Sequence, residues 1–189
     1  MKVWVLAAST GGIDAVTRFL KLVPCRENVA LVYVQHIVEQ QHPQLLKIVA
    51  RNSNWRTRSV DYGSSLKGGW VTIPSPEERF DIDGEGLMGV VDSGGWQAPY
   101  RPNIDDVARQ VATFYRHCSG LIVFTGMGGD GCKGAACVRD SGGQVWVQTP
   151  SSCAAIAMPE AVLGAGGVMF VGTVEELAEK FNQEIGVAD

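Results

Sequence analysis

The sequence predicts an α/β fold in which a doubly wound, mostly parallel sheet lies between helices, with an antiparallel hairpin near one edge. Three observations predict this fold. Short apolar runs of the kind that form buried parallel strands recur along the chain. Amphipathic segments with helical spacing follow several of these runs, and the connecting turns are rich in glycine. Neither an internal repeat nor a linker-like segment interrupts the chain, so we expect one domain over residues 1–189.

The composition is typical of a folded globular protein, with 46% apolar and 19% charged residues. A net charge of −4 argues against nucleic-acid binding by bulk electrostatics. No apolar run approaches the roughly 20 residues that span a bilayer, and the N-terminus lacks the pattern of a cleaved signal peptide. The five cysteines form no C-x-x-C pair and are odd in number, which predicts reduced, buried thiols. We therefore expect a cytoplasmic protein without nucleic-acid or membrane partners.

The N-terminal part is expected to alternate strands and helices. Residues 2–8 predict a first buried strand, and residues 13–22 predict a helix that Pro24 stops. A second buried strand is expected over residues 29–34. A further helix opens at His42, which is followed by a proline.

The middle of the chain departs from this alternation. Strands are expected over residues 57–60 and 68–73. Residues 80–83 and 87–91 flank a Gly-Glu-Gly turn, a pattern typical of an antiparallel hairpin. We expect these strands to extend one edge of the sheet, and the turn-rich loop 93–102 to lie over a site.

The C-terminal part returns to alternating strands and helices. Asn103 is expected to cap a helix, and the apolar run 121–125 predicts a strand that ends at a glycine-rich loop. A helix-like segment follows over residues 132–140. The last elements are a strand over 143–147, a helix over 159–163, a strand over 168–171 and a helix opened by the capping-box residues Thr173 and Glu176.

Three polar residues follow the ends of predicted strands: Ser9, His36 and Asp130. Because the carboxyl ends of parallel strands share one edge of a sheet, these residues can converge despite their distance in sequence. A serine hydroxyl needs a neighbouring base to become nucleophilic, and a histidine base needs an acceptor that fixes its tautomer. The helix start after Ser9 and the glycine-rich loop before Asp130 both offer N–H groups to an oxyanion. The arrangement predicts acyl transfer by a Ser-His-Asp triad.

Each of these residues also has an ordinary structural interpretation. A serine at a strand end commonly caps a helix, a histidine after a strand is often structural, and an aspartate in a glycine-rich loop commonly shapes a turn. The G-x-S-x-G elbow of α/β-hydrolases is absent, because Ala7 stands where its first glycine belongs. Three histidines and scattered cysteines give no metal-ligand spacing, so we expect no metal and no cofactor.

A nucleotide-binding module is a competing interpretation. The spacing Gly126-x-Gly128-x-x-Gly131 follows a strand and opens a helix, which formally meets the dinucleotide fingerprint. That fingerprint also requires an acid at the end of the next strand, but this strand ends at residues 147–149 without one. The charge of Asp130 would moreover repel a pyrophosphate. The triad interpretation is therefore favoured.

Five strings of the sequence occur together in a specific order: Ala8-Ser-Thr-Gly-Gly12, Val34-Gln-His36, Tyr100-Arg-Pro102 with Asp105, Phe124-Thr-Gly-Met-Gly-Gly-Asp-Gly131, and Gln148 through Met158-Pro159. In this order they resemble the catalytic domain of the CheB-type chemotaxis protein-glutamate methylesterases, over essentially the whole chain. The S-T-G-G and T-G-M-G-x-D-G strings are specific when they occur together. Enzymes of this family hydrolyse methyl esters of receptor glutamates, releasing methanol, and many also deamidate receptor glutamines.

The resemblance implies a role for each matching residue. Ser9 would be the nucleophile, His36 the general base and acid, and Asp130 the residue that orients His36. The backbone N–H of Met127 would help to bind the oxyanion. The remaining residues implied are Thr10, Gly11 and Gly12, which would shape the pocket, and Arg101, which would contact the receptor.

The resemblance also implies the setting in which the protein works. Its substrate would be the cytoplasmic region of a methyl-accepting chemoreceptor, and no cofactor would be needed. The receiver domain that normally precedes this catalytic domain is absent from the sequence. The chain is therefore expected to be either a fragment or a stand-alone form, with a receiver domain or a histidine kinase acting from elsewhere.

Three positions depart from the family pattern, because Ala7 and Ala157 stand where glycines are usual and Phe80 stands where a histidine is common. The methyl group of Ala7 would crowd the nucleophile turn. Since no triad member is lost, we expect an active or modestly impaired esterase. The alternative is a catalytically impaired protein that keeps the esterase fold and binds a receptor or another signalling partner.

Overall fold

Seven strands form the central sheet of the computed structural model, which describes residues 1–91, 95–96 and 98–186. They are β1 (Lys2–Ala8), β2 (Val29–Gln35), β3 (Arg56–Arg58), β4 (Trp70–Thr72), β7 (Ser119–Val123), β8 (Gln144–Gln148) and β9 (Phe170–Gly172). Their order across the sheet is β3-β4-β2-β1-β7-β8-β9, and every neighbouring pair is parallel. This is the predicted doubly wound parallel sheet.

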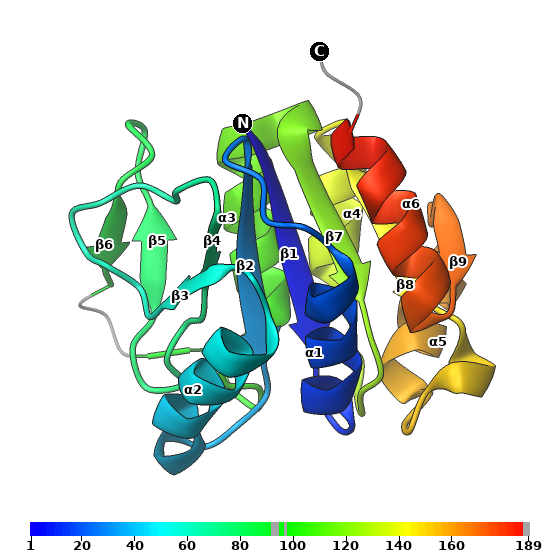
Figure 1. Cartoon of the computed structure of the whole chain (residues 1–189). Helices are drawn as coiled ribbons and strands as arrows, with labels where there is room; N and C mark the ends of the chain where they lie inside the picture. Colours follow the sequence, from blue (N-terminus) through cyan, green and yellow to red (C-terminus); the bar gives the residue numbers. More distant parts are fainter. Residues whose placement is uncertain (92–94, 97, 187–189) are drawn as a thin grey trace.

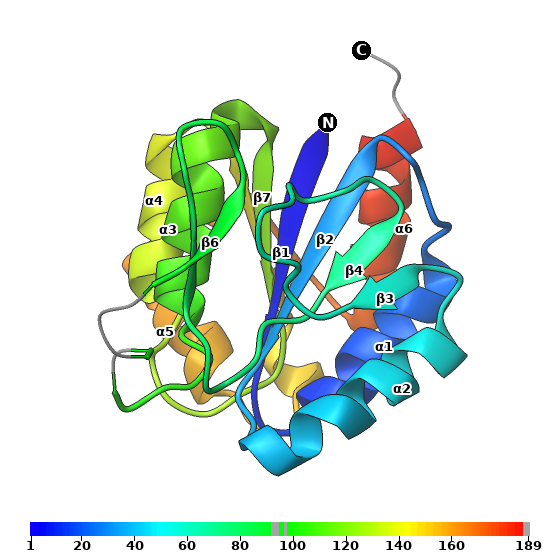
Figure 2. The ribbon, with the colours of Figure 1, turned by 90° about the vertical axis from the view of Figure 1, so that its left-hand side faces the viewer.

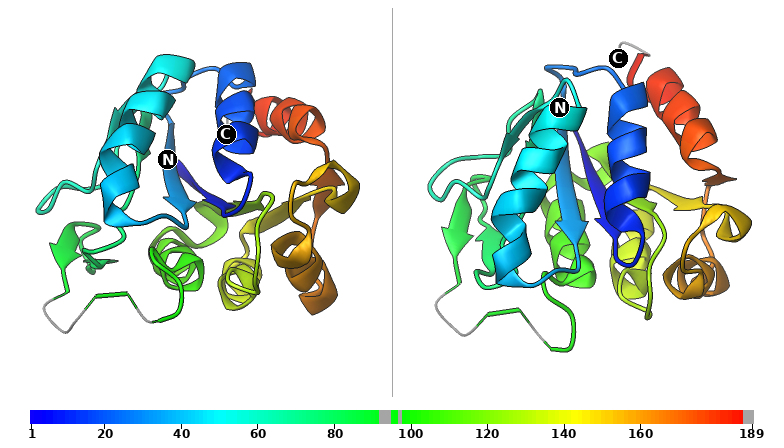
Figure 3. Two further views of the ribbon diagram at one scale, coloured as in Figure 1. Left: turned by 90° about the horizontal axis from the view of Figure 1, so that it is seen from below. Right: turned by 60° about the horizontal axis from the view of Figure 1, so that its bottom comes forward.

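Helices cover both faces of this sheet. One face carries α1 (Gly12–Leu22), α2 (His42–Asn52) and α6 (Val174–Gly186), and the other carries α3 (Ile104–Tyr115), α4 (Cys132–Asp140) and α5 (Ala157–Ala165) (Figure 1). Three short 3₁₀ turns lie at Glu39–Gln41, Arg116–Cys118 and Pro150–Ser152. Seen along the strands from their carboxyl ends, the chain forms three layers, helix, sheet and helix (Figure 3). Among the described residues, no helix is both long and apolar enough to cross a membrane.

The predicted hairpin forms from β5 (Phe80–Ile82) and β6 (Met88–Val90), which pair antiparallel. It is a separate two-stranded sheet and does not extend the central one, which corrects the expectation that all the middle strands join its edge. Figure 2 looks at the β3 edge and shows the hairpin on the side of α3 and α4. Phe80 and Met88 are buried in the same core as α3, so the hairpin covers part of this face beside the helices.

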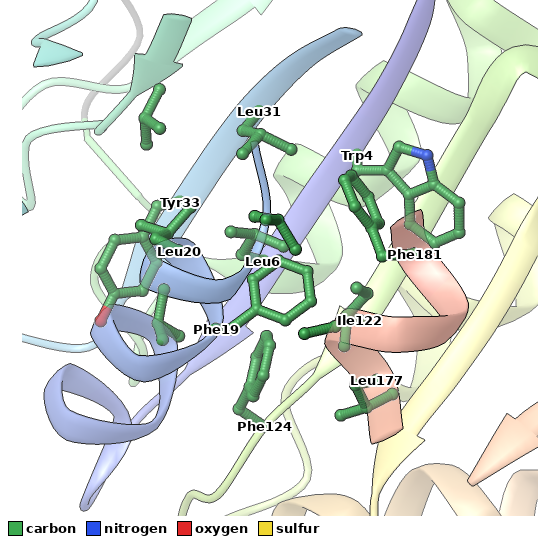
Figure 4. Packing of buried hydrophobic residues seen from close by; sticks show 14 of the residues in the cluster. Trp4, Leu6, Phe19, Leu20, Leu31, Tyr33, Ile122, Phe124, Leu177 and Phe181 are labelled. Atoms are coloured by element: carbon green, nitrogen blue, oxygen red, sulfur yellow. The ribbon is translucent and has the colours of Figure 1, made fainter. Parts of the chain in front are cut away.

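Alternate side chains of β1 serve the two faces, because successive residues of a strand point in opposite directions. Trp4 and Leu6 pack with α1 and α6, whereas Val3 and Val5 pack with α3. Figure 4 shows the first of these cores, in which Phe19 lies between other aromatic rings. Its ring centroid is 5.4 Å from that of Phe124 and 5.3 Å from that of Phe181. Burying each such side chain contributes about 1.5–3 kcal/mol.

Helices α3 and α4 approach each other closely at their N-terminal ends. A Cβ added to Gly134 of α4 would lie 2.7 Å from the Cβ of Ala108 and 3.1 Å from the Cα of Asp105, both on α3. Glycine is therefore required at this crossing, and the approach brings the start of α4 against the first turn of α3.

Most predicted elements lie within two or three residues of their expected positions. The expected caps are confirmed: Asn103 accepts a 2.8 Å hydrogen bond from the N–H of Asp106, and Thr173 and Glu176 form the capping box. Shifts of two residues occur, for example, in β7, which ends at Val123, and in α5, which begins at Ala157 rather than Pro159. Position 120 in β7 requires glycine, because the Trp4 ring occupies the space that a side chain would need.

Two further expectations need comment. All five cysteines are free thiols, as expected, but they are half-buried and not fully buried. Part of the predicted loop 93–102 lies outside the described residues, namely residues 93, 94 and 97.

Candidate active site

The carboxyl ends of β1, β2 and β7 lie side by side at one edge of the sheet. Ala7 of β1 is paired with Val34 of β2 on one side and with Val123 of β7 on the other. The chain winds outward from β1 in both directions, so the crevice beside this strand is the topological switch point at which α/β proteins bind ligands. The left view of Figure 3 faces this edge.

The structure brings His36 and Asp130 together. His36 directly follows β2, and its Nε2 lies 2.8 Å from Oδ2 of Asp130, in the loop between β7 and α4. The Asp130 side chain has no exposed surface, and that of His36 is 13% exposed. A charge-assisted hydrogen bond in such a buried setting holds the imidazole at one nitrogen.

Asp130 is further held by the N-terminus of α3. Its Oδ2 accepts the N–H of Ile104 at 2.8 Å, and its Oδ1 accepts the N–H of Asp105 at 2.9 Å. These are the first two N–H groups of the helix, which have no partner within the helix, and the helix dipole there favours negative charge. The carboxylate that faces His36 is therefore fixed by α3 and not by its own loop.

Asp105 makes the reciprocal contact. From the first turn of α3 its Oδ1 accepts the N–H groups of Gly131 at 2.9 Å and Gly134 at 2.7 Å, at the start of α4. Burial raises the pKa of Asp105, the N–H of Gly134 acts against that rise, and the charge of Asp130 adds to it. Asp130, in the loop before α4, thus binds the start of α3, and Asp105 of α3 binds the start of α4. The sequence contained no signal for this reciprocal arrangement, although Asp105 belongs to one of the recognised strings.

Ser9 lies between β1 and α1, and its backbone is held at three points. Its N–H donates to the carbonyl of Thr125 at 3.1 Å, and its carbonyl accepts the N–H of Gly12 at 2.9 Å and the Gln35 Nε2 at 2.8 Å. The turn requires glycine at position 11, where φ is 76°. Gln35 is a further site residue, missed because a glutamine at a strand end carries no distinct sequence signal.

The glycine loop after β7 presses against Ser9. A Cβ added to Gly126 would lie 2.9 Å from the Ser9 Cβ and 2.6 Å from the Cε of Met158. The hydroxyl of Thr125 lies 2.9 Å from the carbonyl of Thr10, which ties the loop to the Ser9 turn. Met127 is 56% exposed, and its backbone N–H meets no acceptor in the described part of the chain.

Two hollows meet at Ser9 and His36. The larger has a volume of about 860 Å³ and is lined in addition by Tyr100, Arg101 and Met127, among others. The smaller, of about 280 Å³, extends over the N-terminal end of α1 and is lined by the predicted residues Thr10, Gly11 and Gly12. All the predicted surface residues of the site therefore border one of the two hollows, and Asp130 lies behind His36.

The three departures from the family pattern line neither hollow. Ala7 is fully buried on the face of the sheet that α3 covers, and the expected crowding of the nucleophile turn stays a prediction. Phe80 packs in the hairpin core, where its ring centroid is 6.0 Å from that of Trp96, and Ala157 is the first residue of α5. Among the described residues, no three His, Cys, Asp or Glu side chains are grouped so that they could hold a metal ion.

Comparison with known proteins gives concordant results. The family model described as CheB methylesterase matches residues 4–181. A protein-glutamate methylesterase/protein-glutamine glutaminase of Saccharophagus degradans is 30% identical over 166 residues, which are 88% of this chain and 46% of that protein. A similarly named Leptospira interrogans protein is 26% identical over 178 residues, 94% of this chain and 91% of its own length. The first relatives are thus about twice as long as this chain.

A solved structure has the same fold. The crystal structure of the Thermotoga maritima CheB methylesterase catalytic domain superposes with a TM-score of 0.88 and 25% sequence identity. The similarity covers 97% of this chain and 98% of the Thermotoga domain.

Proposed function

Because this chain belongs to the CheB methylesterase family, we propose that it is a serine hydrolase that removes methyl esters from glutamate side chains of chemoreceptors. The observation that carries the proposal is the buried His36–Asp130 pair, 2.8 Å apart, which borders the same hollow as Ser9. We assign Ser9 as the nucleophile, His36 as the general base and acid, and Asp130 as the residue that orients His36. The receptor glutaminase activity named in the relatives would use the same groups on an amide and release ammonia.

The pairing of His36 with Asp130 supports a role for each ring nitrogen. With the Nε2–H of His36 donating to Asp130, Nδ1 is the nitrogen that remains to accept the Ser9 proton. Ser9 Oγ then bonds to the ester carbonyl carbon, and the proton passes to Nδ1. His36 returns this proton to the departing methoxy oxygen, and methanol leaves. Water next gives a proton to His36 while its oxygen bonds to the acyl carbon. His36 returns this proton to Ser9 Oγ as the bond between Ser9 and the acyl group breaks, which frees the glutamate carboxyl group and restores Ser9.

The oxyanion is proposed to bind at the glycine loop. The Met127 N–H is the donor we assign, since it borders the larger hollow and no described acceptor takes it. Thr10, Gly11 and Gly12 are proposed to shape the smaller hollow. One such donor is worth on the order of 10²–10³ in rate. None of these steps uses a cofactor.

The substrate is proposed to be the cytoplasmic region of a methyl-accepting chemoreceptor, with Arg101 at the rim of the larger hollow as a receptor contact. In this proposal residues 1–189 form a single catalytic domain that acts in the cytoplasm. Control by a receiver domain or a histidine kinase would come from outside these residues. A non-catalytic binding module is not favoured, because the three departures from the family pattern lie away from both hollows.

Methanol release from methylated receptor membranes tests the proposal. The purified protein is compared with Ser9→Ala and His36→Ala, and labelling by a serine-directed fluorophosphonate is followed in parallel. We expect release and labelling by the wild type, and loss of both in Ser9→Ala. In His36→Ala, the rate of methanol release is expected to fall by at least about 10³-fold. A wild type that releases no methanol and leaves Ser9 unlabelled would overturn the proposal.

A further inference from the structure

We propose that Tyr100 is a positioning residue of this site, whose ring fixes the orientation of the His36 imidazole and whose hydroxyl braces the glycine loop. The inference rests on the proposed function, in which His36 transfers protons and the loop binds the oxyanion. Tyr100 lies just before Arg101 on the segment that leads into α3, and it borders the larger hollow.

The first contact is a stack of two rings. The centroids of Tyr100 and His36 are 4.9 Å apart, and their planes are inclined by only 12°. Asp130 holds the imidazole at one nitrogen, which leaves the ring free to turn about that hydrogen bond. The Tyr100 ring, which lies flat against the face of the His36 imidazole, removes this freedom. Stacked rings attract each other beyond the effect of the area that they bury.

The second contact is with the glycine loop. The N–H of Gly129 points to the Tyr100 Oη at 3.4 Å. Gly128 has a φ of 85°, and a Cβ added there would lie 2.4 Å from the same oxygen. The Tyr100 hydroxyl therefore lies against the two residues that follow Met127, where it limits the movement of the N–H assigned to the oxyanion.

The segment that carries Tyr100 is itself fastened on both sides. The carbonyl of the next residue, Arg101, accepts the N–H of Ile37 at 3.3 Å, and Ile37 is the neighbour of His36 in the chain. A few residues later, the first N–H groups of α3 bind Asp130. One stretch of chain thus holds the acid by its helix start and the base by an aromatic ring.

A matched pair of variants separates the two contacts of Tyr100. Tyr100→Phe keeps the ring over His36 and removes the hydroxyl, whereas Tyr100→Leu removes both. We expect kcat to fall about 10- to 100-fold in Tyr100→Leu, because small misplacements of a catalytic group have effects of this size. We expect Tyr100→Phe to recover most of that loss and KM to change less than about threefold in either variant. The residual deficit of Tyr100→Phe measures the contact with the loop.

Three kinetic outcomes would overturn the inference. The first is a Tyr100→Leu variant with the kcat of the wild type. The second is a rise in KM at constant kcat, which would make Tyr100 a substrate contact only. The third is a Tyr100→Phe variant as slow as Tyr100→Leu, which would leave the ring stack without effect on His36.

A measurement without substrate keeps this inference separate from the proposed function. In the proton NMR spectrum, the Nε2–H of His36 is expected to give a downfield signal, which His36→Gln assigns by its loss. We expect the signal to be sharp and slow to exchange with water in the wild type and in Tyr100→Phe, and broadened in Tyr100→Leu. Equal exchange in all three proteins would overturn the inference. A wild type that keeps this signal but cleaves no ester would instead contradict the proposed function alone.

Discussion

The two sides of the candidate site are built in different ways. On the acid side, the fully buried Asp130 carboxylate accepts hydrogen bonds from His36 and from two N–H groups of α3. On the serine side, Ser9 and Met127 border an open hollow, and glycine packing holds the backbone there. This fold therefore fixes His36 through a buried polar network. It keeps the surface beside Ser9 open, and shapes it by close backbone contacts.

The largest effect is expected when the acid side is broken. In Asp130→Asn the partner of His36 loses its charge, and the amide cannot accept the imidazole N–H and both N–H groups of α3 as the carboxylate does. We expect kcat to fall on the order of 10⁴-fold, as expected for a wrong histidine tautomer. The free energy of unfolding should fall by about 1–3 kcal/mol. Kinetics and urea unfolding measure the two effects.

Asp140→Asn is the matched control for that experiment, because Asp140 is an exposed aspartate at the far end of α4. In this variant, neither the free energy of unfolding nor the activation free energy given by kcat should change by more than about 0.5 kcal/mol. If Asp130→Asn behaved like this control, the buried network would have no part in holding the base.

An intermediate effect is expected on the serine side. Met127→Pro removes the N–H assigned to the oxyanion, and we expect kcat to fall by about 10²–10³. Met127→Ala keeps the N–H and removes only the exposed side chain. Its kcat should fall much less, with the larger change in KM. Equal losses in the two variants would show that the oxyanion donor lies elsewhere. Unlike Asp130→Asn, Met127→Pro should leave the His36 Nε2–H signal in the NMR spectrum unchanged.

The smallest effect concerns two adjacent acids in the first turn of α3. Burial raises the pKa of Asp105. Burial acts in the same direction on Asp106, but hydrogen bonds from Arg79 and Arg109 lower its pKa overall. When the folded protein raises a carboxyl pKa, stability is lost as the pH rises above the ordinary pKa of about 3.9. When the folded protein lowers a carboxyl pKa, stability is lost as the pH falls below that ordinary value.

Asp105→Asn and Asp106→Asn should therefore show opposite trends with pH. Relative to the wild type, Asp105→Asn should gain stability as the pH rises from about 3 to 7, because it lacks the group that opposes folding when charged. Asp106→Asn should be destabilised at neutral pH by about 1 kcal/mol, and the deficit should vanish as the pH falls through the lowered pKa. Urea unfolding at several pH values measures both trends. Parallel trends would contradict the assignment of the two shifts.

The sequence predicted much of the fold and the meeting of three polar residues at one sheet edge, for a physical reason. Each of Ser9, His36 and Asp130 follows a buried apolar strand, and parallel strands end at one edge whatever their order along the chain. The hairpin was recognised, but not its separation from the main sheet, because the alternating pattern of β5 and β6 is the same in either arrangement.

The supporting residues could not be predicted in the same way. The stacking of Tyr100 on His36 and the reciprocal contacts of Asp105 and Asp130 depend on how the start of α3 lies against the loop before α4. The partners are 25 and more residues apart and follow no period. Even the closeness of α3 and α4 rests on a single glycine, Gly134, which in the sequence is only an unfavourable residue within a helix.

The order of the strands also has a consequence for synthesis of the protein. β7 lies beside β1 in the sheet, yet 94 residues separate His36 from Asp130. A nascent chain therefore exposes Ser9 and His36 long before the acid and the glycine loop leave the ribosome. Under the proposed function, such a chain would carry Ser9 without an aligned base, and a fragment released at this stage would hydrolyse no ester. The proposed activity would therefore begin only when the second half of the sheet has been added to the first.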